Sequence, residues 1–375
     1  MSRAGPDRSL LWIVRKAGSL VLVMELPREQ AATVNVASSP KKVRFLTLDA
    51  LRGAGAIAVM AGHAGIMLGA YMPPFMYLSV DMFFVLSGFV LAHAYDRKFA
   101  EGLSVATFLK ARIARLYPIY LVGLVLGLVS VAFTNTHALS TARALLSFFF
   151  GLFALPSPPM GPLGALFPLN GPFWSLFFEF WVANLIFALF WRQLRGWVLA
   201  LVILTSAGIL AGLGLYFGSL DFGWTWHQLP GGFARVCFSF FAGVALSRFH
   251  ARQARHPAVP SWACLLVFTA VVLLPLQGFA KGPYEVAIVL LVFPALIYFG
   301  AGAIERRPQI GKALGDASYA IYAVHRPLLT ILLWPLALER QSPLLQRYGV
   351  EVALIIVIGA LAWFTNRLLT SGKGA

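Results

Sequence analysis

The sequence predicts an all-α, polytopic transmembrane helical bundle, and three observations lead to this prediction. Hydrophobic residues make up 59% of the 375-residue chain and charged residues only 12%, whereas a soluble domain is about one quarter charged. Eleven apolar segments follow one another along the chain, most of them near the ~20 residues that cross a bilayer as a helix. Lysine and arginine are abundant in some of the intervening loops and scarce in others, as in multi-span membrane proteins.

Residues 1–43 are predicted to form a basic N-terminal tail outside the bundle. Their apolar run, Leu10 to Leu26, is interrupted by three charged residues, and it is too short to span a membrane. The run fits either an interfacial helix or an untranslated stretch ahead of a start at Met24, and the second interpretation is favoured. Residues 44–370 are expected to form one domain, and 371–375 a short C-terminal tail.

The apolar segments of this domain share a length and composition suited to membrane helices, except that the fourth is too short to cross alone. They lie at 48–70, 75–95, 116–134, 144–155, 173–191, 197–217, 231–249, 260–277, 284–303, 317–338 and 349–369.

Positive charge predicts how these segments cross the membrane. If segment 144–155 does not span and the N-terminus is inside, 23 of the 30 lysines and arginines fall in cytoplasmic stretches and four in outer loops. The positive-inside rule therefore favours about ten spans with both termini cytoplasmic. Segment 144–155 and the Pro- and Gly-rich 156–172 then form a re-entrant or capping piece on the outer side. The net charge of +16 thus needs no nucleic-acid partner.

The first segment, Thr47 to Ala70, carries Arg52 and His63 eleven residues apart. Eleven residues turn a helix about 20° past three full turns, so both side chains share one face, roughly 16 Å apart along the axis. Alone, the arginine fits snorkelling to the headgroups and the histidine fits packing. Together they indicate a site, because ionisable residues at membrane depth usually face a protein interior or a wet cavity.

Two further stretches add polar groups. The second segment holds Asp81 near its outer end and a Ser87–Gly88 pair at mid-depth, and such a small pair most often marks close helix packing. The loop after it carries Lys110, Arg112 and Arg115. This loop fits a positive-inside anchor, or a cytosolic phosphate site, because guanidinium forks pair with phosphate oxygens.

The fifth and tenth segments contribute the remaining candidates. Trp174, Ser175 and Glu179 open the fifth, and His325 lies in the tenth, while Arg235 at the outer end of the seventh also fits snorkelling outward. By depth we expect an outer group of His63, Asp81, Glu179 and Arg235, suited to general-base chemistry on a hydroxyl. We expect an inner group of Arg52, Arg112, Arg115 and His325, suited to phosphate. Neither the two cysteines nor any other spacing predicts a disulfide framework or a metal site.

Taken together, these stretches resemble the acyltransferase 3 family of integral membrane acyltransferases. The resemblance covers about 44–370 and rests on LDALRGAGAIAVMAGHAG with Arg-x10-His, VDMFFVLSGFVL, KARIARLYPIY, GPFWSLFFEFW and SYAIYAVHRPL, in family order. It implies a ten-span helical bundle that moves acyl groups, commonly acetyl from acetyl-CoA, onto sugar hydroxyls. The family's essential Arg–His pair falls on Arg52 and His63, and its basic motif on Arg112 and Arg115. Lys110-Ala111 replaces the paired arginines that often open that motif, and no esterase-like domain is expected after the bundle.

The resulting hypothesis is acyl transfer from acyl-CoA, a co-substrate rather than a permanently bound cofactor, to a hydroxyl of a glycan-type acceptor. Arg52, Arg112 and Arg115 bind the CoA phosphates. His63, oriented by Asp81 or Glu179, acts as general base, or as a nucleophile through an acyl-histidine. The hypothesis leaves the oligomeric state open and places the protein in the bacterial inner membrane.

The acceptor is expected on the outer side, where Glu179 and Trp174 help to place it. The residues assigned to substrate binding are Trp174, Ser175, Arg235 and His325. The alternative is a multi-span transporter or flippase of a sugar or anionic substrate without bond chemistry, although no internal repeat supports it.

Overall fold

A computed structural model of the chain describes residues 11–16, 19–24, 44–133, 139–160, 164–334 and 343–371. The chain divides into two units, Met1–Arg44 and Phe45–Ala375. In the first unit, strands β1 (Leu11–Lys16) and β2 (Ser19–Met24) pair antiparallel, with Leu11 opposite Met24. An interfacial helix over this apolar run is therefore wrong: its β-branched and aromatic side chains favour strands. The predicted tail 371–375 lies outside the described residues, except for Ser371.

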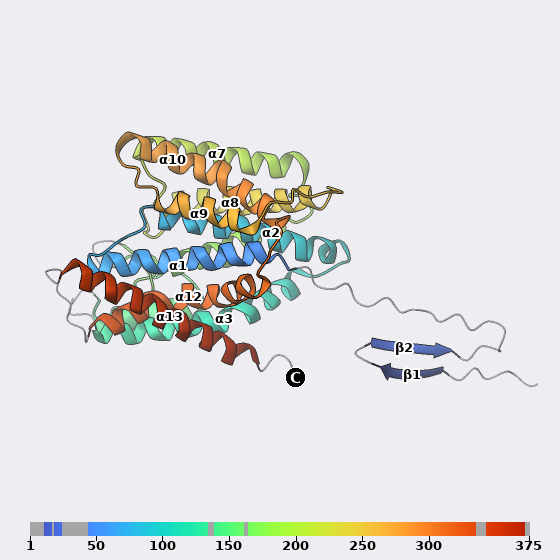
Figure 1. Ribbon diagram of the computed structural model, residues 1–375, viewed down its shortest axis with the longest axis horizontal. Helices are drawn as coiled ribbons and strands as arrows, with labels where there is room; N and C mark the ends of the chain where they lie inside the picture. The colour runs from blue at the N-terminus through green and yellow to red at the C-terminus, as the bar shows by residue number, and fades with distance from the viewer. Residues whose placement is uncertain are drawn as a thin grey trace, which may run out of the picture. The chain divides into compact units, whose positions relative to one another are not determined.

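From Phe45 onward, the described residues form helices and loops with only two isolated β-bridges, which confirms the all-α class for this unit (Figure 1). The elements are α1 (Leu46–Leu68), η1 (Met76–Leu78), α2 (Ser79–Ala100), α3 (Val105–Ser130), η2 (Val131–Phe133), α4 (Thr141–Leu152), α5 (Phe173–Phe177), η3 (Phe178–Ala183), α6 (Asn184–Leu189), α7 (Gly196–Phe217), α8 (Leu229–His250), α9 (Ser261–Leu273), η4 (Gly278–Ala280), α10 (Lys281–Ala287), η5 (Ile288–Val292), α11 (Phe293–Ala301), α12 (Pro308–Leu333) and α13 (Leu344–Ser371). The stretches η3 and η5 are π-helical.

Seven of the described helical segments are long and apolar enough to cross a membrane. They are Leu46–Leu68, Met76–Ala100, Val105–Phe133, Gly196–Phe217, Leu229–His250, Gly278–Ala301 and Leu344–Leu369. Three shorter apolar helices, Thr141–Leu152, Phe173–Leu189 and Ser261–Leu273, also match predicted segments. The protein is thus integral to a membrane, while ten spans, a capping role for Thr141–Leu152 and cytoplasmic termini remain predictions.

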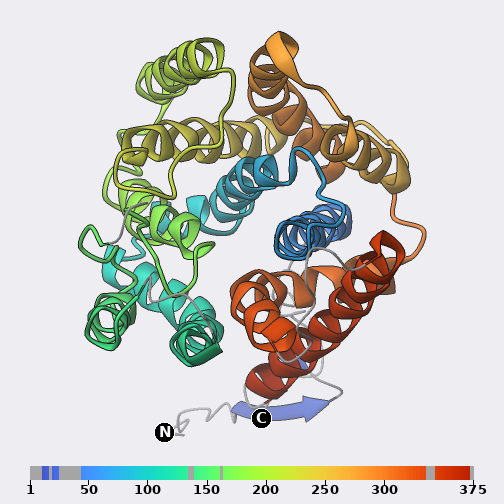
Figure 2. The same cartoon turned by 90° about the vertical axis from the view of Figure 1, so that its left-hand side faces the viewer.

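Helix α1 lies at the centre of the bundle and packs against α2, α9, α11, α12 and α13, as the view in Figure 2 shows for its red and orange neighbours. Gly53 allows α1 to approach α12 closely, because a Cβ at that position would lie 2.5 Å from Leu314 Cβ of α12. The predicted packing role of Gly88 is confirmed in the same way, since a Cβ there would lie 1.9 Å from the Phe240 carbonyl oxygen of α8. Small residues let helix backbones approach closely inside membranes.

Pro327 inside α12 shapes the part of the bundle that holds the polar residues. A proline has no N–H, so the carbonyl four residues earlier loses its helical hydrogen bond. Asn170, from the loop before α5, replaces that bond: its Nδ2 donates to the Ala323 carbonyl at 2.8 Å. The loop is thereby attached to α12 two residues before His325.

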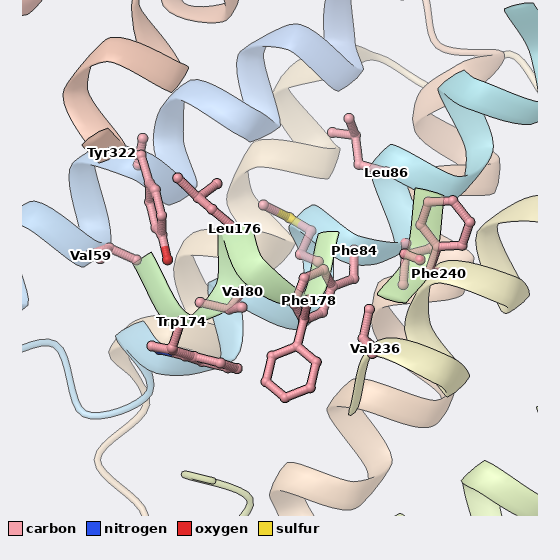
Figure 3. Close-up of a cluster of buried hydrophobic side chains, with 14 of the residues drawn as sticks. Val59, Val80, Phe84, Leu86, Trp174, Leu176, Phe178, Val236, Phe240 and Tyr322 are labelled. Atoms are coloured by element: carbon pink, nitrogen blue, oxygen red, sulfur yellow. The ribbon is translucent and has the colours of Figure 1, made fainter. Parts of the chain in front are cut away.

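Aromatic and aliphatic side chains fill the interior beside these polar groups (Figure 3). Trp174, Phe178, Phe84 and Phe240 are buried there, and Trp174 meets Phe84 and Phe178 edge to face. This packing holds α5 and η3 against α2 and α8, so the polar residues of these elements are fixed on a rigid frame.

Candidate active site

Two histidines meet inside the bundle. His63 of α1 places Nδ1 3.2 Å from Nε2 of His325 on α12. The Nδ1 of His325 lies 3.1 Å and 2.9 Å from the Ile321 and Tyr322 carbonyl oxygens, and that of His63 lies 2.9 Å from the Val59 carbonyl oxygen. A carbonyl oxygen only accepts, so each Nδ1 carries the proton and His325 Nε2 accepts from His63. His63 Nε2 then keeps its lone pair, and His63 is partly exposed whereas His325 is buried.

This contact corrects the predicted depths of the two histidines. His63 was expected in the outer group and His325 in the inner one, two turns above the cytoplasmic surface. The apolar pattern suggested a span beginning at 317, but α12 begins at Pro308. His325 is therefore 17 residues into its helix, or about 26 Å along the axis, and lies level with His63.

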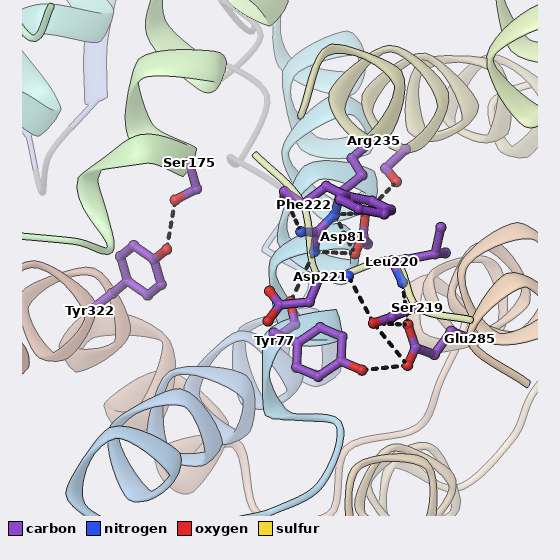
Figure 4. A network of polar contacts seen from close by, with 11 residues as sticks. Tyr77, Asp81, Ser175, Ser219, Leu220, Asp221, Phe222, Arg235, Glu285 and Tyr322 are labelled. Atoms are coloured by element: carbon purple, nitrogen blue, oxygen red, sulfur yellow. Dashed lines mark hydrogen bonds and ion pairs between the residues drawn. The ribbon is translucent and has the colours of Figure 1, made fainter. Parts of the chain in front are cut away.

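Asp81 does not orient His63, contrary to expectation, because it is paired with Arg235. The guanidinium Nη2 lies 2.6 Å from Asp81 Oδ2, and both side chains are 0% exposed. Arg235 also donates to the carbonyls of Phe222 at 2.7 Å and Tyr77 at 3.0 Å, and stands 5.1 Å from the Trp174 ring. Arg235 therefore does not snorkel outward, since a buried charge is stable only when paired and hydrogen-bonded (Figure 4).

A second buried carboxylate, Glu285 of α10, extends this network (Figure 4). It accepts from the Tyr77 hydroxyl, from Ser219 Oγ at 3.2 Å and from the backbone N–H of Leu220. Glu285 is not among the site residues predicted from the sequence, although a carboxylate at the start of an apolar segment is a usable signal. The network joins the N-terminal ends of α2, α8 and α10 and the loop after α7.

Glu179 also has a partner other than His63. Its Oε1 accepts from Arg112 Nη2 at 2.9 Å and from Ser87 Oγ at 2.8 Å. Glu179 and Arg112 were expected in different depth groups, so this separation is wrong as well. Glu179 belongs to the π-helical η3, and π-helical turns occur frequently at functional sites. Arg112 Nε is buried and has no partner among the described residues.

The other arginines of the predicted phosphate site differ in exposure. Arg52 is held between α1 and α12: it donates to Ser318 Oγ at 2.8 Å, to Asp49 at 2.8 Å and to the Gly315 carbonyl at 2.9 Å. Its side chain is 26% exposed. Arg115 is exposed, whereas Arg112 is buried, so the two do not present one continuous surface.

Ser175 connects the fifth predicted segment to the histidine pair. Its hydroxyl lies 2.6 Å from the Tyr322 hydroxyl, and the Tyr322 ring centre is 5.9 Å from that of His325. Tyr322 is not among the site residues predicted from the sequence, although its spacing of three residues from His325 places both on one helical face. Trp174, also assigned to substrate binding, is buried beside Arg235 rather than open to the outside.

An apolar helix bundle that encloses a histidine pair and ion-paired carboxylates defines an integral membrane protein with ionisable residues in its interior. The chain belongs to the acyltransferase family expected from its motifs: the family model for the acyltransferase domain matches residues 45–365. The protein is therefore a membrane acyltransferase, and the transporter alternative is set aside.

Several characterised proteins are similar to this chain. Protein 2 in the picA locus of Rhizobium radiobacter is 39% identical over 180 residues, which cover 44% of this chain and 93% of that protein. The exopolysaccharide production protein ExoZ of Rhizobium meliloti is 28% identical over 311 residues, covering 78% of this chain and 90% of that protein. The peptidoglycan O-acetyltransferase OatA of Listeria monocytogenes is 27% identical over 84% of this chain, which spans 54% of that protein. No solved structure matches.

Proposed function

We propose that the protein transfers an acyl group, most simply acetyl, from acyl-CoA to a hydroxyl of a carbohydrate acceptor in the bacterial inner membrane. The observation that carries this proposal is the His63–His325 contact, which leaves His63 Nε2 unprotonated on a partly exposed ring. The membership in the acyltransferase family supports the reaction type. The names of ExoZ and OatA, which refer to exopolysaccharide and to peptidoglycan O-acetylation, support a glycan hydroxyl as the acceptor.

In this mechanism His63 is the general base. Its Nε2 takes the proton of the acceptor hydroxyl while the oxygen attacks the thioester carbonyl carbon. The tetrahedral intermediate then expels the CoA thiolate, which takes the proton from His63, so the products are the ester and free CoA. His325 Nε2 accepts the Nδ1–H of His63 throughout and stabilises the imidazolium. A positioned base of this kind contributes roughly 10²–10⁴-fold to the rate.

The donor is proposed to bind at the cytosolic end of α3. Lys110 and Arg115 are exposed there, and arginine pairs well with phosphate oxygens. The unpartnered Arg112 Nε is a further donor. Arg52, bonded to Ser318 and still 26% exposed, is available on the neighbouring helix. Glu179 orients Arg112 in this arrangement.

The acceptor is proposed to approach from the opposite end. Asp81 fixes Arg235, which in turn supports the face of Trp174, so these three residues shape the outer side of the site. Ser175 and Tyr322 share a hydrogen bond next to His325 and are proposed to receive the acceptor hydroxyls.

Acetyl transfer in membranes tests the proposal. Labelled acetyl-CoA is supplied on the cytosolic face, and label is followed into the surface-glycan fraction with the wild type and with His63→Ala. Label that appears with the wild type and disappears with a well-expressed His63→Ala supports both the reaction and the base. Equal transfer by both proteins makes His63 a packing residue.

A further inference from the structure

Arg326 follows His325 on α12 and has no carboxylate partner among the described residues. Its Nη1 contacts the sulfur of Met67, and the guanidinium makes no other hydrogen bond or ion pair with the residues that the structure describes. A thioether is a weak acceptor, and Arg326 is only partly exposed. Its charge is therefore largely withdrawn from water, with no counter-charge from the described part of the chain.

Among the described residues, four other arginines inside the bundle differ from Arg326 in this respect, because each is paired with a carboxylate. The pairs are Arg52–Asp49 at 2.8 Å, Arg112–Glu179 at 2.9 Å, Arg235–Asp81 at 2.6 Å and Arg248–Asp96 at 2.7 Å. Arg347, in the first turn of α13, donates to the backbone carbonyls of Leu68 and Gly69 instead. An uncompensated buried charge is strongly destabilising. Arg326 is thus positioned to receive its counter-charge from a ligand.

The position of Arg326 indicates which substrate supplies that charge. Met67 is the second-last residue of α1, and Arg347 donates to the Gly69 carbonyl at 2.7 Å just beyond it. Arg52, near the proposed donor site, is 15 residues before Met67 on the same helix, or about 22 Å away along the axis. The CoA phosphates are therefore too far from Arg326, whereas an acceptor entering from the outer end meets it.

Arg326 also lies close to the histidine pair, because it directly follows His325 on α12 and His325 contacts His63. General-base catalysis creates a second positive charge on His63, and like charges at short range repel. An anion bound to Arg326 cancels this repulsion, so an anionic acceptor both occupies the arginine and favours its own deprotonation.

We propose that Arg326 binds a carboxylate of the acceptor, and that the acceptor is therefore an acidic glycan containing a uronic-acid-type sugar. Because a guanidinium binds a carboxylate with two parallel hydrogen bonds, this contact fixes the sugar's orientation beside His63. Arg326 is a specificity-determining residue in this scheme. The proposal rests on the proposed function for its consequence in catalysis, although binding itself is measurable without turnover.

Binding is tested on the full-length protein in detergent, with glucuronate, glucose and inorganic phosphate as probes. We expect glucuronate, but not glucose, to raise the melting temperature of the wild type and of Arg347→Gln. Arg347 is a suitable control because its hydrogen-bond partners among the described residues are backbone carbonyls. The shift disappears in Arg326→Gln and is partly retained in Arg326→Lys. No shift in the wild type, an equal shift in Arg326→Gln, or a larger shift with phosphate overturns the carboxylate assignment.

Turnover is tested with two matched acceptors, a glucose tetrasaccharide and the same tetrasaccharide with one glucuronate. A charge-assisted contact predicts that wild-type kcat/KM is ~10–100-fold higher for the acidic acceptor. In Arg326→Gln the ratio falls to near one, mainly through KM. If Arg326→Gln instead lowers kcat/KM equally for both acceptors, their ratio stays as in the wild type. Arg326 then stabilises the oxyanion of the intermediate, and the proposal is overturned. Glucuronate binding without any acetyl transfer by the wild type contradicts the proposed function but leaves the anion site in place.

Discussion

His63 Nδ1 on α1 and His325 Nε2 on α12 lie 3.2 Å apart although 262 residues separate them in the chain. The backbone carbonyls beside each Nδ1 assign the proton positions of both rings. The bond between the rings couples the two histidines, so they act together. Residues that act as a unit give non-additive losses when they are removed.

His325→Ala should lower kcat by roughly 10–100-fold, because the His63 ring loses the acceptor that holds its tautomer and orientation. The double variant with His63→Ala should be no slower than His63→Ala alone. Acetyl-transfer rates of the three variants at equal expression test this. If the fold-reduction in kcat of the double variant is the product of those of the two single variants, the two histidines act independently.

Asp81→Asn should destabilise the protein by about 3–5 kcal/mol, because it leaves Arg235 buried without its counter-charge. The measurement is the melting temperature in detergent. A double variant, Asp81→Leu with Arg235→Met, should recover much of the loss and retain acetyl transfer. A double variant that is stable but has no acetyl-transfer activity would instead show that Asp81 takes part in catalysis.

Arg115→Ala should raise the KM for acetyl-CoA several-fold with little change in kcat, because an exposed arginine contributes binding to the donor rather than stabilisation of the transition state. The KM of the wild type should rise with salt more steeply than that of the variant, since surface charges are screened. Arg143→Ala, at an arginine of the predicted outer side, is the matched control. A fall in kcat at unchanged KM contradicts a binding role for Arg115.

Asn170→Leu should cost about 1–3 kcal/mol of stability, because the Ala323 carbonyl is left buried without a donor. Pro327→Ala restores the N–H that this carbonyl lacks, so the double variant should be more stable than Asn170→Leu alone. Thermal denaturation of both variants checks the coupling. If the double variant loses as much stability as the two single variants together, Asn170 stabilises the loop in another way.

The sequence predicted where the helices lie along the chain, but it did not predict which helices pack against one another. Each of the eleven apolar segments coincides with helical structure, because an uninterrupted apolar run in a membrane has few alternatives to a helix. Local spacing also identified the shared face of Arg52 and His63 and the packing role of Gly88. The pattern within a segment does not show which helices become neighbours.

The errors in the site follow from that limit. Asp81 and Arg235 each looked like an isolated charge, yet they pair across 154 residues of sequence. The depth of His325 was misjudged because α12 starts at Pro308, before the apolar part of the segment. Glu179 reaches Arg112 from a π-helical turn, and the hydropathy of the sequence does not distinguish a π-helical turn from an α-helical one. The pairing of the site residues therefore depends on contacts between segments that are distant in the sequence, and these contacts are visible only in the structure.

The Asp81–Arg235 pair has a consequence for how the protein is made. The two residues are 154 positions apart, and at about 5–20 residues per second a ribosome needs roughly 8–30 s to synthesise the intervening chain. During that time α2 leaves the translation machinery with its carboxylate uncompensated, in a lipid environment that penalises it. Stable membrane integration of α2 therefore waits for α8, so biogenesis of the N-terminal half depends on a helix synthesised much later.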